Sequence, residues 1–311
     1  MNPQYKKQIL IIVSAVFILT NGLIAYFVIN KNVKPQSTES IKLGLFSKNE
    51  DQYLLNNIDR IHYFSVWGKE FDDRNNTILS RIEAIGKPGI VTLEPWPQFE
   101  ENNDRKLLLT NIKDGKYNQI IKDFCSLADS KIKDKLYLRV GHEMELNNTS
   151  RYPWSFNEPE LFIFAYRNYV DQCKSVTSKV IYVWSPAGND KQELYYPGDN
   201  YVDIVGMSWY SYPAYEWFTY KKILPFDEIM KDKYNRVSRF NKPIMAAEFG
   251  FAGTPDQKLT IFNPLLNRGD LKKKYPLLES IVLFSDKTES WVPNIIEPPD
   301  WTITEEKLKQ I

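Results

Sequence analysis

The sequence is poor in the residues that build metal centres and disulfide frameworks. It has 311 residues but only two histidines, His62 and His142, and two cysteines, Cys125 and Cys173. Neither histidine lies in a cluster with ligand-like spacing, so we predict no metal site and no cofactor. Two cysteines cannot form the framework of a domain this long, and we interpret them as small core residues. A single bridge between them, in an oxidising compartment, stays open.

The sequence also lacks an excess of charge of either sign. Lysine and arginine total 40, against 39 for aspartate and glutamate. Such a chain has no net field to draw it onto nucleic acid, so we expect no nucleic-acid partner. The content of 43% hydrophobic and 25% charged residues is instead typical of a globular protein with a full core.

One segment departs from this globular composition. Residues 9–29 form an uncharged, mostly apolar run of 21 residues, which as a helix is about as long as a bilayer core is thick. Lys6 and Lys7 favour a cytoplasmic N-terminus, although Lys31 and Lys34 weaken the asymmetry. Because no clear cleavage site follows, we predict a single-pass signal anchor in the cell membrane, with the body of the chain outside. A cleaved signal peptide, which would give a secreted protein, and a buried globular helix are the alternatives.

The rest of the chain predicts one large domain. Residues 31–40 are polar and contain Pro35, which is typical of a linker, and the folded domain is expected over residues 41–311. Helix-like stretches at 104–130 and 157–178, the second with Asn157 as its N-cap, separate some of its strand-like runs. Eight such runs recur, at 41–46, 61–67, 89–95, 136–143, 180–186, 202–209, 243–250 and 280–286. This alternation predicts an α/β fold, the (β/α)₈ or TIM barrel.

Two glutamates lie where the chemistry of such a barrel is expected. Active sites of these barrels form at the carboxyl ends of the strands, and Glu143 and Glu248 end the fourth and seventh predicted strands. A single glutamate at a strand end is more often a surface residue. The pair meets the needs of a retaining glycosidase, in which one carboxyl protonates the leaving oxygen and the other attacks the anomeric carbon.

Longer segments carry a family resemblance. LYLRVGHEMELNNTSRYPWS (136–155) resembles the Arg-x-x-His-Glu-Met segment of glycoside hydrolase family 26, the β-mannanase family in a clan of barrels with catalytic glutamates on strands four and seven. VTLEPW (91–96) and YYPGDNYVDIVGMSWYSY (195–212) resemble its third-strand end and sixth-strand region. KPIMAAEFG (242–250) resembles its nucleophile strand, and PDWTIT (299–304) its closing element.

The resemblance implies roles for individual residues. It makes Glu143 the acid/base and Glu248 the nucleophile, with His142 as the neighbour of the acid/base and Tyr210 as the hydroxyl that holds the nucleophile. For His142 and Tyr210 the alternative is packing without a direct role. Arg139 lies four positions before Glu143. We expect it deeper in the barrel as an ion-pair partner, in a structural or a functional role.

Tryptophans near the predicted strand ends are candidates for sugar binding, because the C–H faces of sugars stack on aromatic rings. Trp154 and Trp96 are the first choices, and core packing is the alternative for each tryptophan. The further candidates are Trp67, Trp184, Trp209 and Trp301.

Three residues depart from the pattern of the family. Glu145 and Ser208 stand where an asparagine and an aspartate are usual, and an aromatic residue that usually follows the acid/base is replaced near Arg151, in a slightly longer loop. We expect all three positions to touch the sugar. We therefore predict retaining hydrolysis of a β-1,4-linked polysaccharide, mannan or a related β-glycan, and leave the sugar open. One alternative is a catalytically altered barrel that binds carbohydrate. The other is a hydrolase or transglycosylase that acts on the cell's own exopolysaccharide.

Overall fold

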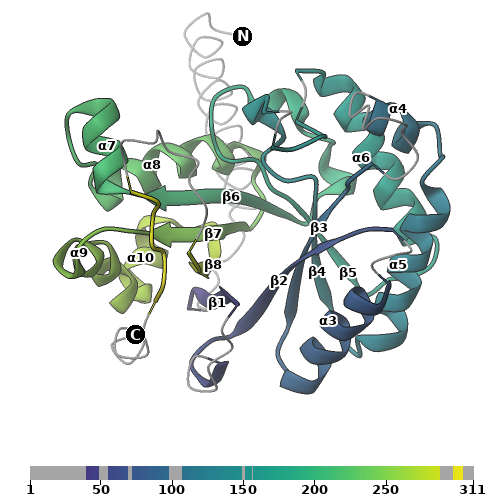
Figure 1. Ribbon diagram of the computed structural model, residues 1–311, viewed down its shortest axis with the longest axis horizontal. Helices are drawn as coiled ribbons and strands as arrows, with labels where there is room; N and C mark the ends of the chain where they lie inside the picture. The colour runs from purple at the N-terminus through teal and green to yellow at the C-terminus, as the bar shows by residue number, and fades with distance from the viewer. Residues whose placement is uncertain are drawn as a thin grey trace, which may run out of the picture. The chain divides into compact units, whose positions relative to one another are not determined.

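The computed structural model describes residues 40–48, 55–68, 72–97, 107–148, 151–155, 157–287 and 297–303. Eight parallel strands follow one another around a closed barrel, and the last pairs with the first (Figure 1). They are β1 (Lys42–Ser47), β2 (Arg60–Val66), β3 (Gly89–Glu94), β4 (Leu136–Val140), β5 (Val180–Trp184), β6 (Ile204–Ser211), β7 (Ile244–Phe251) and β8 (Leu278–Ser285). The predicted (β/α)₈ barrel is confirmed, and each predicted strand overlaps an observed one.

Helices alternate with these strands and surround the barrel (Figure 1). The α-helices are α3 (Asp72–Ile85), α4 (Leu107–Lys113), α5 (Asn118–Lys131), α6 (Pro159–Lys174), α7 (Pro213–Tyr220), α8 (Phe226–Val237), α9 (Pro255–Leu266) and α10 (Arg268–Lys274). Short 3₁₀ turns are η3 (Met144–Leu146), η4 (Gln192–Tyr195), η5 (Asp199–Tyr201) and η6 (Ser238–Phe240).

Two details of the helix prediction are wrong. The stretch 104–130 holds two helices, because Gly115 between α4 and α5 has a φ of 86°, a left-handed conformation that ends a helix. Asn157 is not the N-cap of α6. That position is Glu158, without a side-chain cap, and Pro159 begins the helix, where its fixed φ and missing N–H are favourable.

Alternate residues of each strand face opposite sides of the barrel wall. On β3, Val91 and Leu93 belong to the main core between strands and helices. Ile90 points the other way and belongs to a second, smaller cluster. Other members of the smaller cluster come from β5 to β8, namely Val183, Ile204, Met245, Ala247 and Val282, so this cluster fills the barrel interior. Thr92, two residues after Ile90 on β3, also faces the barrel interior, and at its level the interior side chains become polar.

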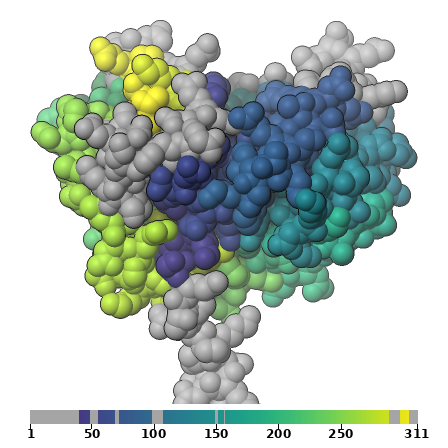
Figure 2. Space-filling view, turned by 90° about the horizontal axis from the view of Figure 1, so that it is seen from below, coloured from purple at the N-terminus to yellow at the C-terminus, as the bar shows by residue number. Residues whose placement is uncertain are grey.

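The closure of the barrel brings the two ends of the folded chain together. All six residues of β1 are paired with β8. On the face seen in Figure 2, the purple residues around β1 lie between the yellow-green C-terminal part and the blue region that contains α3. The barrel wall is therefore continuous through the junction of first and last strands.

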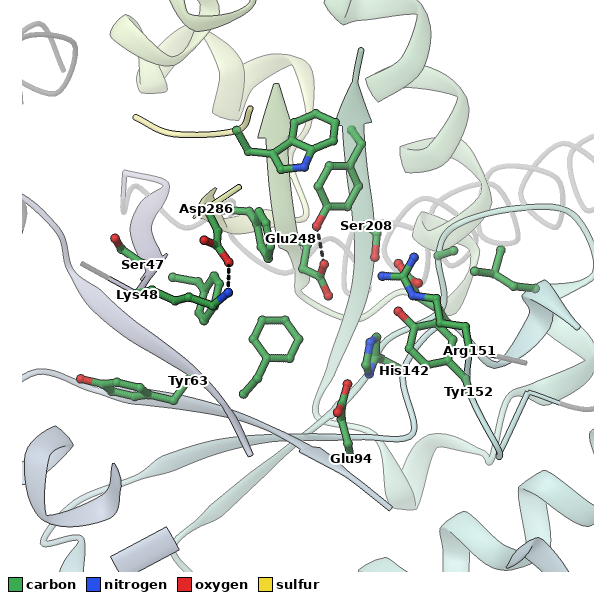
Figure 3. Close-up of a pocket in the computed structure, with 18 of the residues that line it drawn as sticks. Ser47, Lys48, Tyr63, Glu94, His142, Arg151, Tyr152, Ser208, Glu248 and Asp286 are labelled. Carbon is green, nitrogen blue, oxygen red and sulfur yellow. Dashed lines mark hydrogen bonds and ion pairs between the residues drawn. The ribbon is translucent and has the colours of Figure 1, made fainter. Parts of the chain in front are cut away.

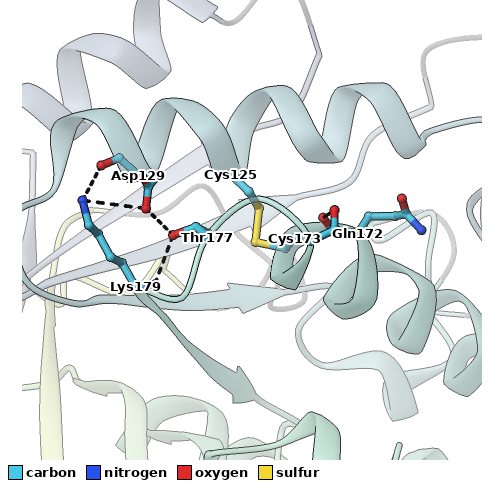
Figure 4. Close-up of a disulfide and its surroundings, with 7 residues drawn as sticks. Cys125, Asp129, Gln172, Cys173, Thr177 and Lys179 are labelled. Carbon is cyan, nitrogen blue, oxygen red and sulfur yellow. Dashed lines mark hydrogen bonds and ion pairs between the residues drawn. A yellow bond between two sulfur atoms is a disulfide. The ribbon is translucent and has the colours of Figure 1, made fainter.

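Cys125 of α5 and Cys173 of α6 form a disulfide with a Cα–Cα distance of 5.4 Å (Figure 4). Both cysteines are fully buried, so the bridge ties two neighbouring outer helices. Nearby, Asp129 accepts a hydrogen bond from Thr177 Oγ1 at 2.7 Å, and its carbonyl accepts one from Lys179 Nζ at 2.6 Å. The interpretation of the cysteines as free core residues is therefore replaced by the bridge that the sequence left open.

The predicted anchor, residues 9–29, and residues 31–39 of the predicted linker lie outside the described residues. Within the described part of the chain, no helix is long and apolar enough to cross a membrane. Residues Ser40–Ile311 form one compact unit.

Candidate active site

A cleft of about 1260 Å³ opens at the carboxyl ends of the barrel strands (Figure 3). Its lining includes both predicted catalytic glutamates and residues from the ends of strands β1 to β4 and β6 to β8. The predicted site residues in its lining are Trp96, His142, Glu143, Tyr210, Glu248 and Trp301. Arg139, Trp154 and Trp67 do not line it.

Two donors hold the carboxylate of Glu248 on β7. Arg139 Nη2 forms an ion pair with Oε1, and the hydroxyl of Tyr210 donates a hydrogen bond to Oε2. The Arg139 side chain is fully buried and that of Glu248 is only 7% exposed. Burial, reinforced by the charge of Glu248, raises the pKa of Tyr210 well above its usual range, so this hydroxyl stays a donor. The carboxylate is thus fixed at the cleft wall.

Arg139 is held from beneath by a polar network inside the barrel. Its Nε donates to Thr92 Oγ1 at 2.6 Å, and Nη1 donates to Ser185 Oγ at 3.4 Å. His62 Nε2 lies 2.7 Å from the same Thr92 oxygen. The network thus joins residues of β2, β3 and β4 to Glu248 of β7. A buried guanidinium is tolerated here because its donors are paired.

The backbone around Glu143 is unusual. Gly141 and Glu143 have φ values of 58° and 55°. Residues other than glycine and asparagine rarely adopt this left-handed backbone conformation. Two hydrogen bonds hold the segment: the amide of Glu143 donates to Ser185 O at 2.8 Å, and Trp154 Nε1 donates to His142 O at 2.7 Å. Strained backbone of this kind is found at functional sites, and here it carries Glu143 beyond the end of β4.

The environment of Glu143 favours its protonated form. Burial raises the pKa of this carboxyl, and repulsion from Glu248 raises it further, against smaller opposing effects of Ser208, Arg151 and Arg139. Only 7% of the residue is exposed. Glu248 carries an ion pair, whereas the pKa of Glu143 is raised, and a glycosidase needs two carboxyls in such unequal environments.

His142 is a packed ring beside Glu143. Burial lowers its pKa well below the usual range, and the charge of Arg139 adds to this effect. Its ring meets Tyr152 edge-on, with centroids 4.8 Å apart. Among the described residues, no group of three or more histidine, cysteine, aspartate or glutamate side chains is arranged to hold a metal ion. We therefore assign His142 to shaping the cleft wall.

Trp154 and Trp67 are not platforms for sugars. Trp154 is fully buried and Trp67 is 1% exposed, because each indole fills the core and donates its N–H to a backbone carbonyl, that of His142 and that of Trp96. Trp184 and Trp209 are fully buried as well. For all four tryptophans the core alternative is the correct one.

Trp96 and Trp301 do line the cleft. Trp96 is half-buried, and its Nε1 donates to Glu94 Oε2 at 3.1 Å. Trp301 is 1% exposed and packs against Tyr210, with ring centroids 5.0 Å apart. The role of Trp96 as a platform for a sugar therefore stays a prediction, whereas Trp301 mainly supports Tyr210.

Of the three departures from the family pattern, Ser208 and Arg151 line the cleft and Glu145 does not. Glu145 Oε1 accepts the backbone N–H groups of Gly188 and Asn189 at 3.0 and 3.2 Å. The expectation that Glu145 touches the sugar is therefore wrong, because its carboxylate turns away to brace the loop after β5.

Several cleft residues were not predicted from the sequence. Glu94 ends β3, and burial raises its pKa. Tyr152 lines the cleft beside His142 (Figure 3). Lys233 reaches the cleft from α8, and burial lowers its pKa. No motif surrounds Lys233 in the sequence. Glu94, at a strand end, carried the same positional signal as Glu143.

Comparisons with known proteins agree with this geometry. The chain is 26% identical over 247 residues to Endoglucanase H of Acetivibrio thermocellus, covering 75% of the chain and 25% of that protein. It is 30% identical over 118 residues to Mannan endo-1,4-beta-mannosidase A and B of Caldalkalibacillus mannanilyticus, covering 38% of the chain and 19% of that protein. The chain thus spans a quarter or less of the length of these relatives.

Solved structures share the fold. GH26C from Muricauda sp. superposes with a TM-score of 0.61 at 18% identity, over 82% of this chain and 81% of that one. A modular endo-beta-1,4-mannanase from Cellulomonas fimi gives a TM-score of 0.58 at 17% identity, over 88% of this chain and 69% of that one. The sequence profile described as glycosyl hydrolase family 26 matches residues 86–242, half of the chain. The chain therefore belongs to glycosyl hydrolase family 26.

Proposed function

We propose that this protein is a retaining glycoside hydrolase that cleaves a β-1,4-linked polysaccharide, mannan or a related β-glycan. The observation that carries the proposal is the unequal pair of carboxyls in one cleft: Glu248 is ion-paired to Arg139, whereas burial raises the pKa of Glu143. The names of the two sequence relatives, an endoglucanase and a mannan endo-1,4-beta-mannosidase, support this substrate class.

The reaction would proceed by double displacement. Glu143 gives its proton to the glycosidic oxygen as that C–O bond breaks, and Glu248 attacks the anomeric carbon to form a glycosyl ester. In the second step Glu143, now ionised, takes a proton from water while the water oxygen displaces Glu248. Since both oxygens of Glu248 are held by donors, the carboxylate is oriented for direct attack. This arrangement favours the role of nucleophile.

Alanine variants of the two glutamates test these roles. Glu248→Ala should abolish turnover of every substrate, because no glycosyl ester can form. Glu143→Ala should slow polymer cleavage by about 10²–10⁴-fold, while an activated aryl glycoside, which departs without an acid, still loads the enzyme. Azide needs no deprotonation, so it should restore turnover of this variant and yield a glycosyl azide of β configuration.

Glu94→Ala is a matched control, because Glu94 also lines the cleft and its pKa is also raised. Azide should not speed this variant. Rates on mannan, cellulose, mixed-linkage glucan and xylan would identify the backbone. An α-glycosyl azide, or rescue of Glu248→Ala alone, would show that the mechanism or the roles are misassigned. Sugar binding without turnover by the unaltered protein would instead favour the carbohydrate-binding alternative.

We also propose that residues 9–29 anchor the enzyme in the cell membrane with the barrel outside. Support comes from the length and apolarity of this run and from the disulfide between Cys125 and Cys173, a bond typical of oxidising compartments. Action on the cell's own exopolysaccharide, by hydrolysis or transglycosylation, would suit such a position. Protease added to intact cells should remove the barrel, and its protection until the membrane is broken would contradict this orientation.

A further inference from the structure

Among the described residues that line the cleft, most cations already have a polar partner. Lys48 Nζ forms an ion pair with Asp286 at 2.7 Å, Arg74 Nη2 donates to Phe64 O at 3.0 Å, and Lys233 Nζ donates to Ala187 O at 2.6 Å. The guanidinium of Arg151 is different. No described residue accepts a hydrogen bond from it or forms an ion pair with it, although it is exposed and lines the same cleft.

The position of Arg151 is set by an aromatic ring. Its Cζ lies 4.9 Å from the centroid of the Tyr152 ring. That ring is 4% exposed and is wedged between His142 and Trp154, with centroid distances of 4.8 and 5.1 Å. Stacking on a rigid ring orients a planar guanidinium and leaves its edge donors available. Figure 3 shows Arg151 and Tyr152 at the opposite end of the cleft from Lys48 and Tyr63.

Among the described residues that line the cleft, no carboxylate forms an ion pair with Arg151. Glu248 and Asp286 are each paired with another cation, Arg139 and Lys48. Glu143 lies eight positions before Arg151 in the chain, and its carboxyl forms no ion pair with the guanidinium. A guanidinium presents donors in a fork that matches two oxygens of one carboxylate or phosphate. The chemistry at this end of the cleft therefore fits an oxyanion brought by the ligand.

We propose that the substrate is an acidic glycan, and that Arg151 binds a carboxylate or phosphate group on the sugar held beside Glu143. This inference rests on the proposed hydrolysis at Glu143 and Glu248. It makes Arg151 a residue that determines specificity. A charged hydrogen bond of this kind corresponds to a preference of about tenfold or more over a neutral group.

The test uses the polysaccharide, among mannan, cellulose, mixed-linkage glucan and xylan, that the full-length enzyme cleaves. Three derivatives of it are compared at matched degrees of substitution: hydroxyethyl, carboxymethyl and phosphorylated. The hydroxyethyl form controls for the bulk of a substituent. The measured quantity is the ratio of kcat/KM on each anionic form to kcat/KM on the hydroxyethyl form. Because any effect of Arg151 on the acid Glu143 acts on all three forms, it cancels in this ratio.

The unaltered enzyme should prefer the carboxymethyl or the phosphorylated form, and the preferred form identifies the group. Arg151→Gln should lower that ratio about tenfold, and Arg151→Lys, which keeps the charge without the fork, should lower it less. Lys48→Gln is the matched control, since it removes a cleft cation that already has a partner, and it should change the ratio less than twofold.

The two hypotheses fail in different ways. Cleavage of the hydroxyethyl form without preference for an anionic form, or a preference that survives in Arg151→Gln, would overturn the role of Arg151 and leave the hydrolase in place. An equal loss of preference in Lys48→Gln would also overturn it, because the effect would then be the general charge of the cleft. No cleavage of any backbone would overturn the proposed function itself.

Discussion

Replacing Arg139 with methionine should destabilise the protein by about 3 kcal/mol, because the change leaves the carboxylate of Glu248 buried without its counter-ion. Removing one partner of a buried ion pair costs about 3–5 kcal/mol. The low end applies here, since Tyr210 still donates to the other oxygen of Glu248. The hydroxyls of Thr92 and Ser185 also lose their hydrogen bonds from Arg139, but each hydroxyl can pair again with a nearby group.

The double variant Arg139→Met with Glu248→Met separates the pair from its surroundings. If the single costs arise from an orphaned charge, removing both charges should cost about 3 kcal/mol less than the sum of the singles. Urea unfolding followed by tryptophan fluorescence measures each free energy of unfolding on the same form of the chain. The pair Arg60–Glu279 at the other end of the barrel has side chains 8% and 24% exposed, so its coupling should be smaller. Strictly additive costs for Arg139 and Glu248 would refute the reasoning.

Three further predictions concern the hydroxyl, the acid and the disulfide. Tyr210→Phe should lower kcat/KM about 10- to 100-fold, which is the value of a hydrogen bond to a charged group. Tyr212→Phe is the control, because it removes a hydroxyl bonded to a backbone carbonyl outside the cleft, and it should change kcat/KM less than threefold. Burial raises the pKa of Glu143, and a general acid must be protonated to act. On a neutral glycan, kcat/KM should therefore fall as pH rises through that pKa, at a higher pH than an ordinary glutamate would give. A pH profile without this fall would contradict the assignment of Glu143 as the acid. Cys125→Ser opens a bridge between residues 48 positions apart and should lower the free energy of unfolding by roughly 2–4 kcal/mol. Urea unfolding measures this loss, and a reducing buffer should cause no further loss in Cys125→Ser.

The sequence was sufficient for the barrel and for the two glutamates. Strand-like runs recur with helices between them, and the geometry of the barrel then places residues after the fourth strand and in the seventh at one mouth. The position of Glu143 and of Glu248 follows from that alone. The burial of Glu143, which raises its pKa, and the pairing of Arg139 with Glu248 in particular are properties of the packed interior, which the sequence alone does not give.

The tryptophans show where such reasoning ends. Trp154 and Trp96 both follow strand ends, yet Trp154 is fully buried and Trp96 lines the cleft. Proximity to a strand end in the sequence gives no information on the direction of a side chain in the following loop. Lys233 was missed for the opposite reason: it belongs to a helix, and only the fold brings it to the loop after β5 through Ala187.

The same packing that buries Trp154 makes it important for the position of Glu143. Glu143 needs a left-handed backbone to leave β4 and enter the cleft, and this conformation carries a cost of about 1–3 kcal/mol that the surroundings must offset. The indole N–H of Trp154 bonds the carbonyl just before Glu143, and Ser185 accepts the amide of Glu143 itself. Since Ser185 also accepts from Arg139, which holds Glu248, one buried set of hydrogen bonds fixes both carboxyls. A substitution in that set should therefore change stability and catalysis together, whereas one at Arg151, exposed at the end of the cleft, should change only the choice of glycan.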